Sequence, residues 1–254
     1  MEFVKKLLSN LFCQEPKGPA VSEAPRRTID IKNQPDEPED FGLKVNWFAV
    51  KTSDTDVVLK ALNFGEGRVA NWSSGVQAAY SSRIGGYDKD LVFITPPVAG
   101  WVMIVGTSLP YPAMHTPDRH DGIGFAFDNL FSRLATLFSD VQFFGSYRVV
   151  GFVAWARRQR NNSDRIFAFG DGDVYANIGE QTPDEAELGL PNLNGLPLAE
   201  ASARMFEDDV SLPDEDAPLL LAERWSINPG KLTKISLPPA CGVVVELPDI
   251  QSFR

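Results

Sequence analysis

Apolar residues are densest between Val141 and Ile178, a stretch that Phe138–Asp140 leads into. Part of it carries no polar alternation, which is typical of a strand buried on both faces. Arg157–Asp164 is polar and turn-forming, and Gly170–Asp173 favours a tight turn. The pattern predicts three consecutive antiparallel strands, at Val149–Ala156, Ile166–Phe169 and Val174–Asn177.

The chain before this stretch predicts a mixture of strands and helices. Ser53 or Asp54 can cap a helix whose apolar residues recur at helical spacing, and Phe127–Phe138 carries the clearest helical stripe. Val69–Tyr80 fits either a strand or a helix, with Trp72 as its apolar anchor. Strands are predicted at Val45–Lys51, Leu91–Thr95 and Trp101–Val105, the last two as a hairpin.

The C-terminal third predicts short helices and a last strand. Thr182-Pro183-Asp184-Glu185 combines an N-cap residue, a proline at the first helical position and an acid at the third. Further helices are expected over Leu198–Phe206 and Leu219–Trp225, and a strand over Val243–Leu247. We therefore expect one α+β domain over residues 41–254, a mostly antiparallel sheet with helices packed on it.

Residues 1–40 differ from this domain in composition. Residues 14–40 are rich in proline and charge, which predicts a flexible linker. The apolar residues between Phe3 and Phe12 recur at helical spacing and favour a short amphipathic helix, and no run reaches the roughly 20 apolar residues of a membrane span. Two interpretations stay open for that helix: it docks on a partner or membrane surface, or it packs on its own domain or stays loose.

Composition limits the partners and the compartment. The net charge of −10 disfavours direct contact with nucleic acid and suits a basic protein partner. Cys13 and Cys241 are far apart in unlike contexts, which predicts two free thiols and a reducing, cytoplasmic location. Neither cysteine has a CxxC partner, which argues against a zinc site built on cysteine. We expect no metal site and no cofactor.

Reactive groups gather in a single place. His115-Thr116-Pro117-Asp118-Arg119-His120-Asp121 holds both histidines, but its spacing is not HExxH and a proline-rich loop offers no rigid face for both imidazoles. The sequence contains no GxSxG elbow, no GxxxxGK[ST] loop and no GxGxxG. We expect no enzyme, and a hydrolase that uses this loop remains the alternative.

Negative charge is concentrated in one fifth of the chain. Residues 171–223 contain fourteen acids and one base, a net charge of −13, while the remainder is +3. Such an uneven field steers association with a basic partner, although solubility and favourable acids at helix starts also explain it. The predicted partner contacts are Glu207, Asp208, Asp209, Asp214, Glu215 and Asp216, with Asp184 and Glu185 as second choices.

Several Trp, Gly and Pro landmarks also form a recognisable series. They lie in Asn46–Thr52, Val69–Gly75, Val92–Val102, Arg148–Ala156, Thr182–Leu190 and Ala222–Pro229. Over about residues 43–232 the chain resembles immunity proteins of secreted antibacterial toxins, such as those delivered by type VI secretion. The resemblance implies a cytoplasmic inhibitor that binds a cognate effector such as a nuclease, and it transfers no site residues. A scaffold or adaptor that docks by its N-terminal helix is the other alternative.

Overall fold

The computed structural model describes residues 26–114, 122–160 and 162–253. Every strand of this part belongs to one sheet, and each neighbouring pair runs antiparallel. The strands are β1 (Asn46–Lys51), β2 (Arg68–Asn71), β3 (Leu91–Ile94), β4 (Trp101–Gly106), β5 (Asp140–Tyr147), β6 (Phe152–Gln159), β7 (Arg165–Gly170), β8 (Asp173–Ile178) and β9 (Cys241–Glu246).

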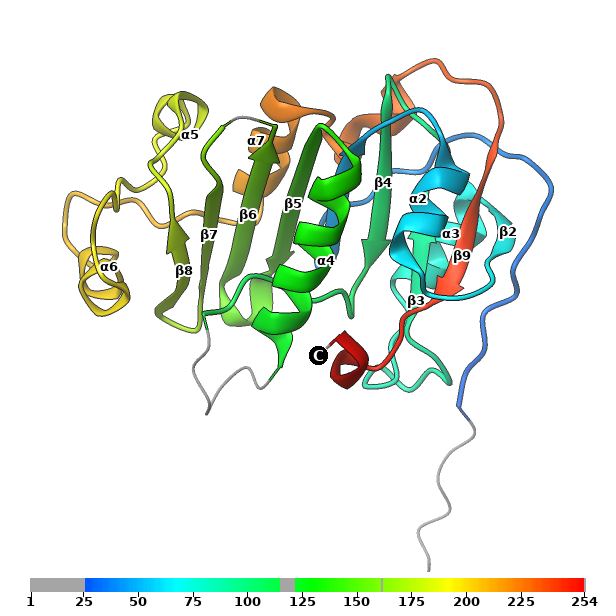
Figure 1. Cartoon of the computed structure of the whole chain (residues 1–254), viewed down its shortest axis with the longest axis horizontal. Coiled ribbons are helices and arrows are strands. Elements are labelled where there is room, and N and C mark those ends of the chain that lie inside the picture. Colours follow the sequence, from blue (N-terminus) through cyan, green and yellow to red (C-terminus); the bar gives the residue numbers. More distant parts are fainter. Residues whose placement is uncertain (1–25, 115–121, 161, 254) are drawn as a thin grey trace, which may run out of the picture.

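The nine strands lie in the order β2-β9-β3-β4-β1-β5-β6-β7-β8, with helices on both faces (Figure 1). The helices are α2 (Thr55–Leu62), α3 (Trp72–Ala79), α4 (Ile123–Leu137), α5 (Pro183–Glu187), α6 (Leu198–Arg204) and α7 (Ala217–Trp225), with 3-10 segments η1 (Arg148–Val150), η2 (Pro229–Lys234) and η3 (Ile250–Phe253). This confirms the α+β class and the mostly antiparallel sheet expected from the sequence. Among the described residues, no helix has the length and apolar character that a bilayer crossing requires.

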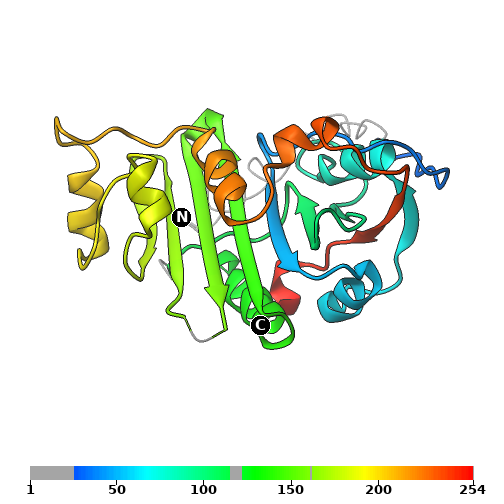
Figure 2. The ribbon, with the colours of Figure 1, turned by 90° about the horizontal axis from the view of Figure 1, so that it is seen from above.

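The central strand β1 supplies both cores. Phe48 points to the face covered by α2 and α4, where its ring lies 5.0 Å from that of Phe143. Its neighbour Trp47 points to the other face, where its ring stacks 5.3 Å from Phe144 beneath α7. Because successive side chains of a strand point to opposite faces, one strand anchors both helical layers (Figure 2).

The stretch between Val141 and Ile178 forms four strands rather than the three predicted. The sequence pattern did not predict β5 as a strand of its own. Val149 and Val150, predicted in a strand, lie in the η1 turn between β5 and β6. Strand β6 is buried on both faces as predicted, but it extends through Gln159. Its polar end stays in the sheet because Arg157 and Arg158 pair with carboxylates on neighbouring segments.

Other local predictions have clear outcomes. The ambiguous stretch Val69–Tyr80 divides at Asn71, whose side chain caps α3 by accepting a hydrogen bond from the Ser74 backbone N–H at 3.0 Å. The β3–β4 hairpin, α4, the capping-box start of α5, and the predicted helices α6 and α7 are all present. The last strand, β9, lies between β2 and β3 rather than at an edge of the sheet.

Residues 26–40 run along the domain as an extended arm, although composition predicted a flexible linker there. The Asn71 backbone N–H donates to the Lys32 carbonyl at 2.7 Å, and the Trp72 N–H donates to the Asp36 carboxylate at 2.6 Å, at the start of α3. Backbone groups, the carboxylates of Asp36 and Asp40, and the partly buried Ile29 and Ile31 hold the arm, so its proline-rich and charged composition did not reveal its order. Residues 1–25, with the predicted amphipathic helix, lie outside the described residues.

Other segments bond to the outer side of each edge strand of the sheet. The arm bonds to β2 through Lys32. On β8, the Val174 N–H donates to Ser202 Oγ at 2.9 Å, and the Tyr175 carbonyl accepts from the Met114 N–H at 2.7 Å. Occupied edges resist pairing with further strands.

Candidate functional site

Helices α5, α6 and α7 lie on one face of the sheet, over the half that contains β5 to β8 (Figures 1 and 2). Ala201 of α6 and Met205, the residue after it, are buried in the same core as Val174 of β8. Trp225 of α7 packs 5.7 Å from Phe144 of β5 and donates a hydrogen bond to Asp184 of α5 at 3.1 Å. The helices and the loops between them carry most of the acids of residues 171–223, so these acids gather on one side of the molecule.

Glu185 is not a surface residue, which corrects its prediction as a partner contact. Its side chain is 1% exposed and its Oε1 lies 2.9 Å from Nε of Arg165, itself 5% exposed. The same carboxylate accepts hydrogen bonds from Trp155 Nε1 at 2.7 Å and from the Thr182 backbone N–H at 2.7 Å. Glu185 completes the predicted capping box and fastens α5 to the sheet, which leaves it unavailable to a partner.

Asp184, the other second choice, remains accessible, with a side chain 37% exposed. Its carboxylate accepts the Trp225 hydrogen bond and lies 3.6 Å from Arg224. Arg224 also pairs with Glu187 at 2.6 Å, so the positive charge is shared. The charge of Asp184 is therefore partly neutralised within the protein.

The three acids that follow α6 are exposed and unequally paired. Arg204 binds Glu207 at 2.9 Å and Asp209 at 2.6 Å, although these side chains are 60% and 71% exposed. The hydrogen bond from Arg204, with its positive charge, holds the pKa of Asp209 below its usual value. Asp208 is exposed and has no ion-pair partner among the described residues.

Asp214, Glu215 and Asp216 lie before the first turn of α7. Asp214 accepts a hydrogen bond from the Asp216 backbone N–H at 3.0 Å, and both carboxylates are exposed. Glu215 is 25% exposed and lies 3.7 Å from Arg148 of η1. The structure thus leaves Asp208, Asp214 and Asp216 exposed and without an ion-pair partner among the described residues.

Several exposed apolar side chains that the sequence pattern did not predict lie near these acids. Val149 is 74% exposed, Val150 is 41% exposed and Phe206 is 61% exposed. Val149 had been assigned to a buried strand, and Phe206 to the end of a packed helix. The glycine after Val150 was the available signal for a turn, since Gly151 adopts a positive φ of 59°.

The arginines of β6 and β7 do not form an anion site. Arg157 pairs with Asp140 at 2.7 Å, Arg158 pairs with Asp164, and Arg165 pairs with Glu185. These pairs join neighbouring segments of the fold and engage all three guanidinium groups within the protein. The thiol of Cys241 donates to the Asn33 carbonyl, and Cys13 lies outside the described residues.

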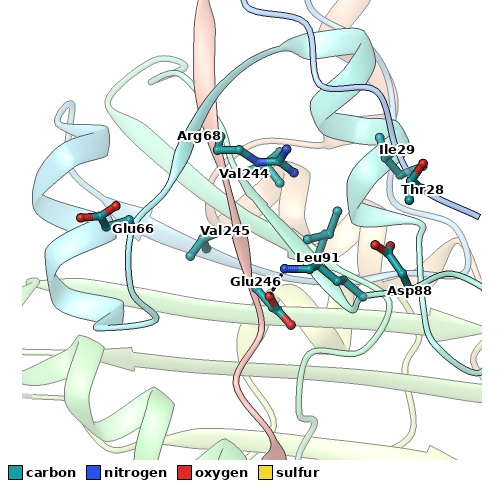
Figure 3. Close-up of a pocket in the computed structure, with 10 residues that line it drawn as sticks. Thr28, Ile29, Glu66, Arg68, Asp88, Leu91, Val244, Val245 and Glu246 are labelled. Atoms are coloured by element: carbon teal, nitrogen blue, oxygen red, sulfur yellow. Dashed lines mark hydrogen bonds and ion pairs between the residues drawn. The ribbon is translucent and has the colours of Figure 1, made fainter.

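A hollow of about 430 Å³ lies at the opposite edge of the sheet, between the arm and strands β2, β3 and β9 (Figure 3). Its lining mixes signs: Glu66, Asp88 and Glu246 face the same space as Arg68, and Lys89 pairs with Glu246 at 2.5 Å. Within the described ranges, no group of three or more His, Cys, Asp or Glu could hold a metal. His115 and His120 lie outside those ranges.

The fold and its surface define an α+β protein with an acidic helical layer on one side of the sheet. No protein-family model matches the chain, and no curated protein or solved structure matches it.

Proposed function

We propose that this protein is an immunity protein that binds a cognate antibacterial toxin and neutralises it by occupying its surface. The observation that carries the proposal is the net charge of −13 in residues 171–223, with the helices of that segment on one face of the sheet. The proposal requires no catalytic group, metal or cofactor. The resemblance to immunity proteins noted in the sequence supports it, and a cytoplasmic location belongs to it.

The expected partner is a basic protein such as a nuclease. A nuclease presents basic groups to phosphate, and an acidic surface can cover those groups while it repels the nucleic acid. Opposite fields also accelerate encounter, so an inhibitor of this kind can capture a toxin before it reaches its substrate.

The first experiment is a binding assay between this protein and the product of the neighbouring gene, in low and in high salt. Asp208→Asn/Asp214→Asn/Asp216→Asn removes three exposed charges from the acidic layer, and we expect association to slow by about tenfold in low salt. The matched control is Asp30→Asn/Asp56→Asn/Glu66→Gln, which removes three exposed charges elsewhere. Absence of a complex in low salt would refute the proposal.

Two other functions are carried by residues outside the described ranges, and no observed geometry favours either. A hydrolase acting on a toxin-made modification would use His115 and His120, and intact protection by His115→Ala/His120→Ala would dispose of it. An adaptor would dock by the N-terminal helix. The deletion that tests it ends at residue 25, because residues 26–40 support α3 through Asp36.

A further inference from the structure

The exposed side chains of Val149, Val150 and Phe206 form a sheet-end patch. The two valines lie in η1, between β5 and β6, and Phe206 follows α6. Their exposed fractions are 74%, 41% and 61%. Single exposed apolar residues are ordinary on protein surfaces. The three residues indicate a binding surface only if they lie next to one another.

Contacts between the elements bring the parts of the patch to the same end of the sheet. The Val150 carbonyl accepts a hydrogen bond from the Asp171 N–H at 2.8 Å, which joins η1 to the β7–β8 turn. In that turn, a side chain at Gly172 would lie 3.7 Å from Cζ of Phe206. The two turns and the end of α6 therefore follow one another across one end of the sheet, at the lower left of Figure 1.

Folding does not require an apolar residue at Val149, and it uses Phe206 only in part, through a ring contact with Phe169 at 6.3 Å. Tight turns at the surface usually carry polar residues or glycine, and Gly151 already supplies the positive φ that this turn uses. Ala201 of α6 and Met205, which follows the helix, are buried against the sheet, at 0% and 1% exposure. Phe206 is 61% exposed although one side of its ring packs on Phe169, and a large apolar side chain that the core covers only in part is better explained by contact with another molecule.

Acids surround the patch. Glu207, Asp208 and Asp209 follow Phe206 directly, and Glu215 lies 3.7 Å from Arg148, the neighbour of Val149. The nearby cations Arg148 and Arg204 are engaged by those acids. An apolar centre with a charged rim is the arrangement in which a few desolvated side chains carry most of the binding energy.

We infer that the partner of the proposed function docks on the sheet-end patch, with Phe206 as the apolar anchor and the surrounding acids facing lysines and arginines of the partner. This inference rests on the proposed function and adds the location and the chemistry of the contact. The partner it fits is a basic protein surface with an apolar depression that receives Phe206.

The test measures binding of the purified product of the neighbouring gene to Val149→Ala/Phe206→Ala. We expect the dissociation constant to rise by at least about thirtyfold, mostly through faster dissociation that depends little on salt. The matched control is Val69→Ala/Ile84→Ala, which removes exposed apolar side chains, 56% and 101% exposed, from the other half of the molecule. That control is expected to stay within about twofold of the wild type.

A second measurement covers the case in which Val149→Ala/Phe206→Ala fails to fold. Amide hydrogen exchange of the wild-type complex is expected to show protection at residues 147–151, 170–173 and 205–210. If the wild type binds but these segments gain no protection, or a folded double variant binds within twofold, the inference is overturned and the proposed function stands. If the wild type does not bind, the proposed function fails and the inference fails with it.

Discussion

Arg165 and Glu185 form an almost completely buried ion pair that joins β7 to α5, with Nε and Oε1 2.9 Å apart. Glu185 also accepts a hydrogen bond from Trp155 of β6 and caps its own helix through Thr182. One carboxylate therefore fixes the position of α5 on the sheet. The accessible acids of this helical layer depend on that position, although Glu185 itself contacts no partner.

Glu185→Gln is expected to destabilise the protein by about 3–5 kcal/mol, because it leaves the Arg165 guanidinium buried without a counter-charge. Urea unfolding measures the change. The control is Glu187→Gln, whose side chain is 67% exposed and whose loss is expected to stay within about 0.5 kcal/mol. A change below about 1 kcal/mol for Glu185→Gln would mean that other groups satisfy Arg165.

Asp36→Ala is expected to release the arm from α3. The Asp36 carboxylate accepts hydrogen bonds from the Trp72 and Ser73 N–H groups, at 2.6 Å and 3.2 Å, and its loss removes about 1 kcal/mol of capping energy. Limited trypsin digestion measures the release as faster cleavage after Lys32. Asp30→Ala changes an exposed acid of the same arm and is expected to leave the cleavage rate unchanged. Equal rates for both variants would contradict the role of Asp36.

Arg204→Gln tests whether the negative charge of the acidic layer speeds or slows association with the partner. Arg204 neutralises Glu207 and Asp209, so its removal makes the acidic layer more negative. Association with a basic partner is expected to accelerate severalfold in low salt, and the gain is expected to disappear in high salt. Lys60→Gln makes the same charge change on α2, on the opposite face, and serves as the control in stopped-flow kinetics. Slower association by Arg204→Gln would argue against a basic partner.

Alkaline stability depends on Tyr111. Burial raises the pKa of Tyr111 to about 12, and nearby Tyr175 adds to the shift. An unfolded tyrosine ionises near pH 10, so between pH 10 and 12 the unfolded state binds fewer protons and stability falls as pH rises.

Tyr111→Phe is therefore expected to lose less stability than the wild type across that pH range, as measured by urea unfolding at a series of pH values. Tyr147→Phe, at a side chain 46% exposed, is the matched control and is expected to retain the alkaline slope. An unchanged slope in Tyr111→Phe would show that other groups cause the alkaline loss.

Local sequence patterns predicted the features that local interactions determine. The unbroken apolar run around Trp155 indicated a strand buried on both faces, and Thr182 with Glu185 indicated a helix start. Distant contacts were not visible to these patterns. The buried role of Glu185 depends on Arg165, twenty residues earlier in the chain, and the order of the arm depends on Asp36 meeting Trp72, thirty-six residues later.

The candidate surface was also predictable only in part from local sequence patterns. Charge can be counted along the chain, so the acidic segment was found before the fold was known. The exposure of Val149 and Phe206 could not be found in this way, because an apolar run looks the same in a buried strand and in a turn that leads into one. The position of η1 between β5 and β6 separates these cases for Val149, and Gly151 was the sequence signal for that turn.

The covered edges of the sheet have a consequence for how recognition could diversify. With Lys32 bonded along β2, and Ser202 and Met114 bonded along β8, a ligand meets side chains of turns and helices instead of an open row of backbone groups. Backbone pairing accepts many sequences, whereas side-chain contact discriminates among them. A few substitutions of surface side chains can therefore change the binding specificity, while the sheet and its core stay the same.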